Sequence, residues 1–482
     1  MMNYILSGYE PKRLFQYFEE LSAIPRGSGN EKGVADWLCA FAEKKGLRYR
    51  RDELHDVVIW KDATPGFEDK PAVMIQGHTD MVTEKDSGTE HDFEKDGLRL
   101  IEKNGWLSAD GTTLGGDDGA AVVIMLELLS DDDCPHPALE CVFTVQEETG
   151  LGGAEHLDVS DLKARKIINI DSEEEGFAVA SCAGSLNTHF VLEKDTVPFQ
   201  NQCMKIKLGG LKGGHSGTDI DAGRQNSILL MGRILTALYE EEPFNLVSLS
   251  GGNKRNAIPR ECEAVISVLD REKAAETVKK VVAALRPELN KVDKSLKVTA
   301  GRTAKATEMY TYKATSAALS FLCLVPNGVL SMSQSKPGLV ESSSNLGIVG
   351  TSDEGIRFDV YSRSSVEPVT DHIVRTLMRL AKVTGLVYHF DDRGPGWAFT
   401  PDTALQKQYL KTYSKLFPDR PAPQVVAIHA GLECGSLLDK LGGGDAIAIG
   451  PDIVDIHTPS EKMDLRSMER TYKLVKAMLA DS

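Results

Sequence analysis

The sequence predicts an α/β domain that is interrupted by a smaller, inserted α+β domain. Three observations support this fold class. Short strands alternate with helices over residues 1–185, the pattern changes over residues 186–394, and the first pattern returns over residues 395–482. The chain of 482 residues also exceeds what one hydrophobic core usually organises. We therefore expect one domain from residues 1–185 and 395–482, and a second domain from residues 186–394.

The first pattern is typical of a sheet with crossover helices. The segment GVADWLCAFAEKKG predicts an amphipathic helix that ends at Gly46. Short β-branched runs bounded by turn residues predict strands buried on both faces. These runs are DVVIW, PAVMIQGH, LECVFTVQ and KIINID. The apolar segment GAAVVIMLELLSDD predicts a crossover helix, and ligands in such sheets collect at the carboxyl ends of the strands.

The middle of the chain predicts a split β-α-β arrangement. Its expected strands and helices are NQCMKIKLGG, SILLMGRILTALYEEE, FNLVSLSGG, AVISVL, KAAETVKKVVAALRPEL and LKVTAG. The last part returns to the first pattern, with the helix TALQKQYLKTYSKLF and the strands QVVAIHAG and DAIAIG.

Composition and charge limit the functional class. A net charge of −16 argues against nucleic acid or an anionic membrane as the main partner. The first residues lack the basic start and long apolar segment of a secretory signal, and the longest apolar run is too short to span a bilayer. The 8 scattered cysteines contain no C-x-x-C pair, which favours reduced thiols. We expect a soluble, cytoplasmic protein.

Several polar residues stand at the end of an apolar strand or in a glycine-rich turn. They occur in the stretches IQGHTD, LGGDDG, VQEETG, INIDSEE and VDIHTPSE. Carboxylates and imidazoles are costly to bury unless something compensates for their desolvation, and a shared cation would do so. Nitrogen and oxygen ligands without thiolate suit Zn²⁺, with Mn²⁺ or Co²⁺ as substitutes. Two histidines and three carboxylates are too many for one open zinc site, but they suit two metals about 3.5–4 Å apart.

Each stretch taken alone also has a structural explanation. His78 and Asp80 are two residues apart, so Asp80 either orients a metal-bound His78 or caps a turn. One aspartate of the Asp117–Asp118 pair would serve as the N-cap of the next helix, although a cap alone does not require two preceding glycines. The acidic run 173–175 is expected to be a solvated loop, which leaves Asp171 as the site residue of its stretch.

Eight motifs occur in the order that they have in one known family. They are GHTDMV, LGGDDG, TVQEETG, NIDSEE, LKGGHSG, VESSSNLG, HAGLECG and IHTPSE. On these motifs the chain resembles the co-catalytic zinc peptidases and amidohydrolases that include aminoacylase and carboxypeptidase G. Within that group it is most similar to the aminoacyl-histidine (Xaa-His) dipeptidases. The resemblance covers essentially the whole chain and implies a zinc-peptidase-like catalytic domain with an inserted lid and dimerisation domain.

The resemblance implies two Zn²⁺ ions per chain. Asp117 would bridge them. His78 and Asp171 would complete one site, and Glu148 and His457 would complete the other.

The resemblance also implies roles for residues around the metals. Asp80 would orient the metal-bound histidine, and Glu147 would be the general base. The peptide bond after the bridging aspartate, between Asp117 and Asp118, would be cis. Many relatives have Ala-Asp-Asn at 116–118, and the dipeptidases often have proline at Ala430, but neither difference removes a ligand.

Four further residues match substrate-site positions of the family. His215 would stabilise the tetrahedral oxyanion from the lid. Asn256, Arg363 and Gly431 would bind substrate, with Arg363 pairing with its free carboxylate. From the sequence pattern alone, Arg363 would be a surface ion pair and Asn256 a turn amide.

The implied activity is hydrolysis of dipeptides, including β-Ala-His, by a metal-activated water and Glu147. An N-acyl amino acid amidohydrolase, a carboxypeptidase or a tripeptidase of the same family would carry the same catalytic residues. A non-catalytic metal-binding protein on the same fold is a third possibility. The resemblance further implies a homodimer that binds a small dipeptide substrate. The acidic net charge leads us to expect no nucleic acid and no membrane partner.

Overall fold

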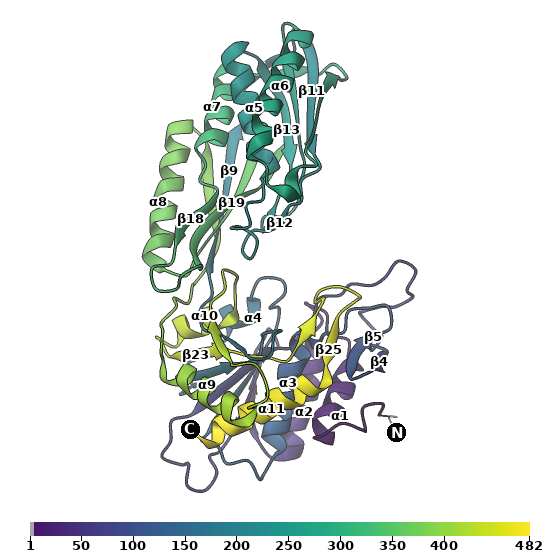
Figure 1. Cartoon of the computed structure of the whole chain (residues 1–482), viewed down its shortest axis with the longest axis vertical. Coiled ribbons are helices and arrows are strands. Elements are labelled where there is room, and N and C mark those ends of the chain that lie inside the picture. Colours follow the sequence, from purple (N-terminus) through teal and green to yellow (C-terminus); the bar gives the residue numbers. More distant parts are fainter. Residues whose placement is uncertain (1–3) are drawn as a thin grey trace. The chain divides into compact units, whose positions relative to one another are not determined.

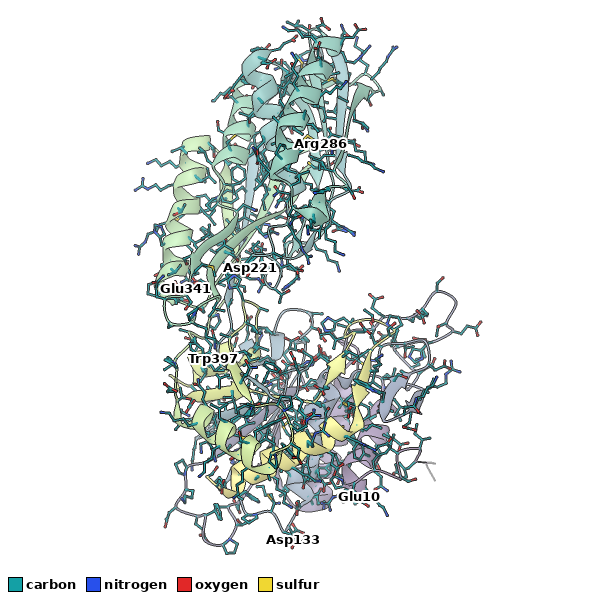
Figure 2. The ribbon with its side chains drawn as sticks, in the orientation of Figure 1. Glu10, Asp133, Asp221, Arg286, Glu341 and Trp397 are labelled. Atoms are coloured by element: carbon teal, nitrogen blue, oxygen red, sulfur yellow. The ribbon has the colours of Figure 1, made fainter. Side chains whose placement is uncertain are left out.

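The computed structural model describes residues 4–482, which form two compact units. Unit 1 consists of Met1–Cys182, Phe399–Ala427 and Leu432–Ser482. Unit 2 consists of Ala183–Ala398 and Ile428–Gly431. Charged side chains such as Asp133 in unit 1 and Arg286 in unit 2 are exposed on the outside (Figure 2). The mixed α/β architecture with an inserted unit confirms the predicted fold class.

A sheet of eight strands forms the centre of unit 1 (Figure 1). The strand order is β1-β2-β6-β3-β7-β23-β8-β22. The strands are β1 (Arg48–Arg51), β2 (Val57–Lys61), β3 (Val73–His78), β6 (Leu139–Thr144), β7 (Lys166–Asn169), β8 (Phe177–Val179), β22 (Gln424–Val426) and β23 (Asp445–Ala448). Strands β6, β3, β7 and β23 are parallel neighbours, so their carboxyl ends meet at one edge of the sheet.

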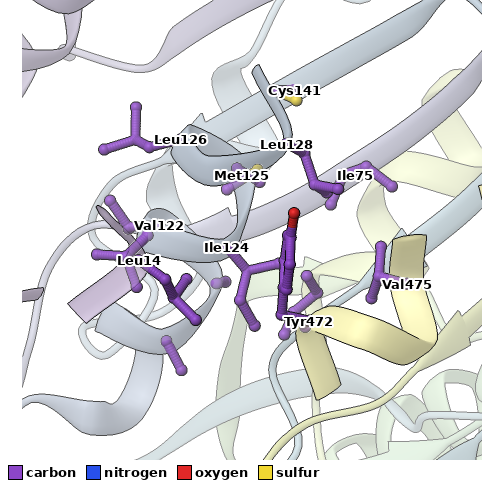
Figure 3. Packing of buried hydrophobic residues seen from close by; sticks show 14 of the residues in the cluster. Leu14, Ile75, Val122, Ile124, Met125, Leu126, Leu128, Cys141, Tyr472 and Val475 are labelled. Atoms are coloured by element: carbon purple, nitrogen blue, oxygen red, sulfur yellow. The ribbon is translucent and has the colours of Figure 1, made fainter. Parts of the chain in front are cut away.

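Helices cover this sheet, and one of them is buried on every side. The helices are α1 (Lys12–Ser22), α2 (Lys32–Lys45), α3 (Gly116–Ser130), α4 (Gly152–His156), α9 (Ala404–Leu416), α10 (Glu433–Lys440) and α11 (Leu465–Ala480). All residues of α3 are buried, as expected for its apolar sequence. In the core, Val122 and Ile124 of α3 lie among Leu14 of α1, Ile75 of β3 and Val475 of α11 (Figure 3).

A second, smaller sheet of unit 1 has the order β24-β25-β5-β4. Its strands are β24 (Ile453–Val454), β25 (Lys462–Asp464), β5 (Trp106–Ala109) and β4 (Leu100–Lys103).

Among the residues from 4 to 482, no helix combines the length and apolar character needed to cross a membrane.

Unit 2 is built on a sheet with the order β16-β11-β15-β13-β19-β20-β9-β21, and β18 (Gly328–Met332) adds to β19. The strands are β9 (Gly184–Glu193), β11 (Gln202–Gly209), β13 (Asn245–Gly251), β15 (Cys262–Val268), β16 (Lys297–Arg302), β19 (Val340–Thr351), β20 (Gly355–Ser364) and β21 (Val387–Gly394). The helices are α5 (Ser227–Glu241), α6 (Arg271–Leu285), α7 (Tyr312–Leu324) and α8 (Glu367–Thr384). Two short ribbons, β10 (Thr196–Pro198) with β17 (Glu308–Tyr310) and β12 (Gly214–His215) with β14 (Ala257–Ile258), complete the unit.

Unit 2 contains the same β-α-β-β-α-β arrangement twice. One half follows the order β11, α5, β13, β15, α6, β16, and the other follows β9, α7, β19, β20, α8, β21. In both halves the sheet order is fourth, first, third, second strand, and all pairs are antiparallel. The second strands of the two halves, β13 and β19, join the halves edge to edge. The split β-α-β expectation therefore describes each half.

The structure differs from the sequence prediction in the segment QVVAIHAG. The strand β22 ends at Val426, and the four residues Ile428–Gly431 belong to unit 2. There the Nε2 atom of His429 lies 2.7 Å from Ser343 Oγ, and the Ala183 N–H donates to Ala430 O at 2.8 Å. These contacts outweigh the local strand pattern.

The acidic run 173–175 is not a fully solvated loop, in contrast to the expectation. Glu175 is buried, and its carboxylate accepts hydrogen bonds from Arg470 Nε at 2.6 Å and from Arg470 Nη2 at 2.7 Å. Arg420 also donates to this carboxylate at 2.6 Å. Only Glu174 of the three is exposed. The run thus contains one ion-paired anchor that ties the loop after β7 to α11.

We expect Glu175→Ala to destabilise the protein, because it leaves two half-buried guanidinium groups without their shared carboxylate. Since both arginines keep some contact with water, the loss should be about 2 kcal/mol, below the range for a fully buried pair. Denaturant unfolding measures it. The exposed neighbour provides the control: Glu174→Ala should change the free energy of unfolding by no more than about 0.5 kcal/mol. Equal effects of the two substitutions would contradict the anchoring role.

Candidate metal centre

The predicted metal ligands lie together at the carboxyl edge of the sheet of unit 1. His78 is the last residue of β3, and Asp171 follows β7 by two residues. Glu148 lies in the turn after β6, and Asp117 lies in the first turn of α3. His457 lies in the loop between β24 and β25. Segments far apart in the sequence therefore supply one cluster.

The carboxylate of Asp117 lies between two imidazoles. Its Oδ1 atom is 3.1 Å from Nε2 of His78, and its Oδ2 atom is 3.1 Å from Nε2 of His457. A second carboxylate approaches the same Nε2 atom of each imidazole. Asp171 Oδ1 is 3.9 Å from His78 Nε2, and Glu148 Oε1 is 3.1 Å from His457 Nε2. The cluster thus has two halves that share one carboxylate.

This donor set fits a pair of divalent cations. Nitrogen and oxygen ligands bound at about 2.0–2.2 Å to one tetrahedral zinc are about 3.3 Å apart, close to the separations within each half. The Oε1 atom of Glu148 is buried without a hydrogen-bond partner, although it lies 3.1 Å from His457 Nε2. Two potential metal-ligand atoms that lie this close without a hydrogen bond between them are arranged as ligands of a common ion. Asp117, Glu148 and His457 have ligand atoms within 4.8 Å of one another.

The neighbouring aspartate has a different environment. Asp118, His78 and Asp171 have ligand atoms within 4.8 Å of one another, so Asp118 competes with Asp117 as a ligand beside His78. However, Asp118 Oδ2 accepts from the His78 N–H at 3.2 Å, and Oδ1 accepts from the Ala121 N–H at 3.2 Å. Both oxygens of Asp118 are therefore engaged by the backbone, which favours Asp117 as the bridging ligand. The Asp117–Asp118 peptide bond is cis, as the resemblance implies.

Asp80 connects the ligands of both halves. Its Oδ1 atom lies 3.3 Å from Nδ1 of His78, the ring nitrogen that faces away from Asp117. Its carboxylate also accepts from the backbone N–H groups of Glu147 at 3.1 Å and Glu148 at 3.3 Å. Ser28 donates a fourth contact at 2.7 Å. One buried carboxylate thus sets the orientation of a histidine and of the glutamate turn.

The glutamate turn directs adjacent side chains to different places. The carboxylate of Glu148 lies beside His457. The ligand atoms of Glu147, Glu148 and His78 also lie within 4.8 Å of one another. Among the described residues, no donor is bonded to the carboxylate of Glu147. This carboxylate is therefore available for a ligand or for a proton.

Burial and neighbouring charges shift the ionisation of the whole cluster. The carboxylates of Asp117 and Glu148, each 3.1 Å from Nε2 of His457, raise the pKa of this histidine to about 10. Burial raises the pKa of Glu147 and of Asp171 well above the usual range, and nearby carboxylates add to both shifts. For Asp117, burial opposes ionisation, but the two histidines outweigh it and lower the pKa. A bound divalent cation would lower the pKa of every carboxyl group that touches it.

Two residues that hold the site were not identified from the sequence. Glu461 is buried and accepts from the backbone N–H groups of Leu114, Gly115 and Gly116 at 2.8, 3.1 and 2.8 Å. These contacts fix the glycine-rich turn before Asp117, where Gly115 has a φ of 65°. The sequence feature that could have identified Glu461 is its position as the last residue of the motif IHTPSE.

The second such residue is Arg26, whose side chain is fully buried. It donates to the backbone oxygens of Thr79 at 2.9 Å, Asp80 at 3.0 Å and Gly115 at 2.5 Å. The guanidinium therefore links the turn after β3 to the turn before α3 and places a positive charge among the buried carboxylates. Nothing in the sequence near Arg26 distinguishes it from a surface residue.

The four predicted substrate-site residues belong to unit 2. His215 lies in β12 and Arg363 in β20, and Arg363 Nη2 is 3.4 Å from His215 Nε2. Burial and the nearby guanidinium lower the pKa of His215. Asn256 is exposed in the turn before β14, and Gly431 ends the segment 428–431. Arg363 is buried rather than the surface group that the sequence pattern alone suggests.

Comparisons with known proteins identify one family domain within the chain and relatives that match its full length. The pattern of the peptidase dimerisation domain (M20_dimer) matches residues 206–296. The cytosol non-specific dipeptidase of Escherichia coli is 34% identical over 482 residues, which cover 99% of each chain. The crystal structure of aminoacylhistidine dipeptidase from Vibrio alginolyticus is 31% identical, with a TM-score of 0.88 and coverage of 99% and 98%. A tripeptidase structure from Staphylococcus aureus shares the fold, with a TM-score of 0.57 and 17% identity. On its full-length similarity to these dipeptidases, the chain belongs to the M20 family of metallopeptidases.

Proposed function

We propose that the protein is a di-zinc dipeptidase that prefers Xaa-His substrates, including β-Ala-His. The observation that carries this proposal is the carboxylate of Asp117, each oxygen of which faces a different histidine at 3.1 Å. Such a shared carboxylate is the bridge that two cations about 3.5–4 Å apart require. The names of the two full-length relatives, a cytosol non-specific dipeptidase and an aminoacylhistidine dipeptidase, support the substrate class.

His78, Asp117 and Asp171 would hold one Zn²⁺, and Asp117, Glu148 and His457 would hold the other. When bound, the metal pair lowers the pKa of a shared water and polarises the scissile carbonyl.

Glu147 would accept the proton of the attacking water and pass it to the leaving amine. Its carboxylate suits this role, because no donor among the described residues competes for it. Asp80 keeps the base in place through the Glu147 N–H and fixes the ring of His78.

Residues of unit 2 would contribute the remaining contacts. Neutral His215 would donate a hydrogen bond to the oxyanion, and Arg363 would pair with the free carboxylate of the dipeptide. Asn256 and Gly431 would line the substrate site. The Arg363–His215 contact of 3.4 Å, together with the lowered pKa of His215, supports a neutral imidazole held beside a guanidinium.

We further propose a cytoplasmic homodimer. The match of residues 206–296 to the peptidase dimerisation domain supports dimerisation, and the name of the E. coli relative supports the location. We propose Zn²⁺ as the metal because the donor set contains histidine and carboxylate but no thiolate.

A substrate panel tests the activity. Protein reconstituted with Zn²⁺ should hydrolyse β-Ala-His and Ala-His faster than Ala-Ala-Ala or an N-acetyl amino acid, and a chelator should abolish turnover. Initial rates at equal substrate concentration provide the comparison. Faster cleavage of the N-acetyl amino acid would instead indicate an amidohydrolase, and faster cleavage of Ala-Ala-Ala would indicate a tripeptidase. Bound zinc without hydrolysis of any member would indicate a non-catalytic metal protein.

Substitutions of the two adjacent glutamates should separate chemistry from metal binding. Glu147→Ala should retain two zinc ions and lower kcat by about 10²–10⁴-fold, because it removes the general base. Glu148→Ala should lose zinc, because it removes a ligand. Elemental analysis of the dialysed proteins measures zinc content, with wild type as the reference. The proposed roles would be refuted by equal zinc contents in the two variants.

A further inference from the structure

A row of fully buried polar side chains lies beneath the metal cluster in unit 1. Gln76 of β3, Thr144 of β6, Asn169 of β7 and Glu433 of α10 each have no exposed surface. Such residues are rare in the interior of a parallel sheet, and Glu433 is the ionisable member of the row. The proposed mechanism uses none of them.

Hydrogen bonds connect the row continuously. Gln76 Nε2 donates to Glu433 Oε2 at 2.6 Å, and the hydroxyl of Thr144 donates to the same oxygen at 2.7 Å. Asn169 Nδ2 donates to Gln76 Oε1 at 2.8 Å. The Asp171 N–H donates to Asn169 Oδ1 at 3.3 Å. The row therefore runs from Glu433 to the backbone of a proposed metal ligand.

The register of the sheet places this row directly below the ligands. Gln76 precedes His78 by two residues, so both side chains point to the same face of β3. Asn169 is the register partner of Gln76, and Thr144 is the register partner of His78. Aligned residues on neighbouring parallel strands also share a face. The carboxylate of Glu433 thus holds the two strands that carry His78 and the Glu147–Glu148 turn.

Glu433 forms no direct ion pair with any residue of the described chain. Its Oε2 atom accepts two hydrogen bonds from neutral donors, and its Oε1 atom is buried without a hydrogen-bond partner. No lysine or arginine of residues 4–482 forms an ion pair with it. A buried carboxylate in this position is costly unless a positive charge lies nearby. Cations held by the ligands above it would provide that charge.

We propose that Glu433 is a positioning residue whose buried charge strengthens metal binding at the cluster above it without contacting the ions. This inference rests on the proposed metal centre. The carboxylate fixes Gln76 and Thr144, and through them the spacing of the strands that present the ligands. Its negative charge adds to the field that the cations experience. Outer residues of this type change metal affinity through orientation and charge.

Glu433→Gln tests the charge while keeping the shape. The side-chain oxygen of glutamine can accept from both Gln76 and Thr144, and its NH₂ group then occupies the place of the unpartnered Oε1. We expect the dissociation constant for Zn²⁺, measured by competition with a chromophoric chelator, to rise about 10–100-fold. Without metal, the Tm of the variant should not fall below that of wild type, because a buried charge has been removed. The gain in Tm on adding Zn²⁺ should therefore shrink.

Two further variants make the result specific. Glu433→Asp keeps the charge but shortens its reach to Gln76 and Thr144, so it should lose less affinity than Glu433→Gln. Glu140→Gln neutralises another buried glutamate of β6, which accepts from the N–H groups of Lys163 and Ala164 and not from a residue of the row. It should leave the dissociation constant for Zn²⁺ unchanged.

Three results would overturn the inference. They are an unchanged dissociation constant in Glu433→Gln, an equal loss in Glu433→Asp and Glu433→Gln, and an equal fall in Tm of Glu433→Gln with and without metal. Each would make Glu433 a purely structural hydrogen-bond acceptor. A wild-type protein that binds no Zn²⁺ would instead refute the proposed metal centre itself, so the two failures are distinguishable.

Discussion

The carboxylate of Asp117 stands between two imidazoles, and much of unit 1 is arranged to hold it there. A buried carboxylate flanked by other carboxylates is unfavourable without compensation, so its neighbours must be fixed closely. Glu461 fixes the turn before it, Arg26 fixes the turn beside it, and both oxygens of Asp118 are engaged by backbone N–H groups. The burial of all of α3 gives this turn a rigid support. The same constraint explains why His78 lies at the end of β3 and Asp117 in the first turn of α3, where the backbone is held by the sheet and the core.

Adjacent residues in this site repeatedly take different roles. The Asp117 carboxylate faces the histidines, while the Asp118 carboxylate accepts from the N–H groups of Ala121 in α3 and His78 in β3. Glu148 faces His457, while the carboxylate of Glu147 accepts no hydrogen bond from the described residues. In each pair the backbone places neighbouring side chains on different sides, so two like charges can stand next to each other in the sequence without competing for one position.

Much of this arrangement could be predicted from the sequence, because it depends on local signals. Strand ends follow from short β-branched runs and the turn residues after them, and they place His78 and Asp171 at the sheet edge. The choice of Asp117 over Asp118 came from the resemblance, since both fit a helix start. Partners distant in sequence could not be predicted. Glu175 is bound by arginines 245 and 295 residues away, and Glu433 meets Gln76 across 357 residues. The strand expected through the segment 428–431 failed for the same reason, because contacts with Ala183 and Ser343 decide its place.

The repeated β-α-β-β-α-β arrangement of unit 2 allows its two halves to differ. When two copies of one polypeptide pair edge to edge, every substitution appears on both sides of the symmetry axis. In unit 2 the edges of β13 and β19 meet within a single chain, so each half can acquire residues that the other lacks. The half that begins with β11 carries His215, and the other carries Arg363, which meets it. A symmetric framework can thereby present an asymmetric pair of side chains, which suits a ligand whose two ends are chemically different.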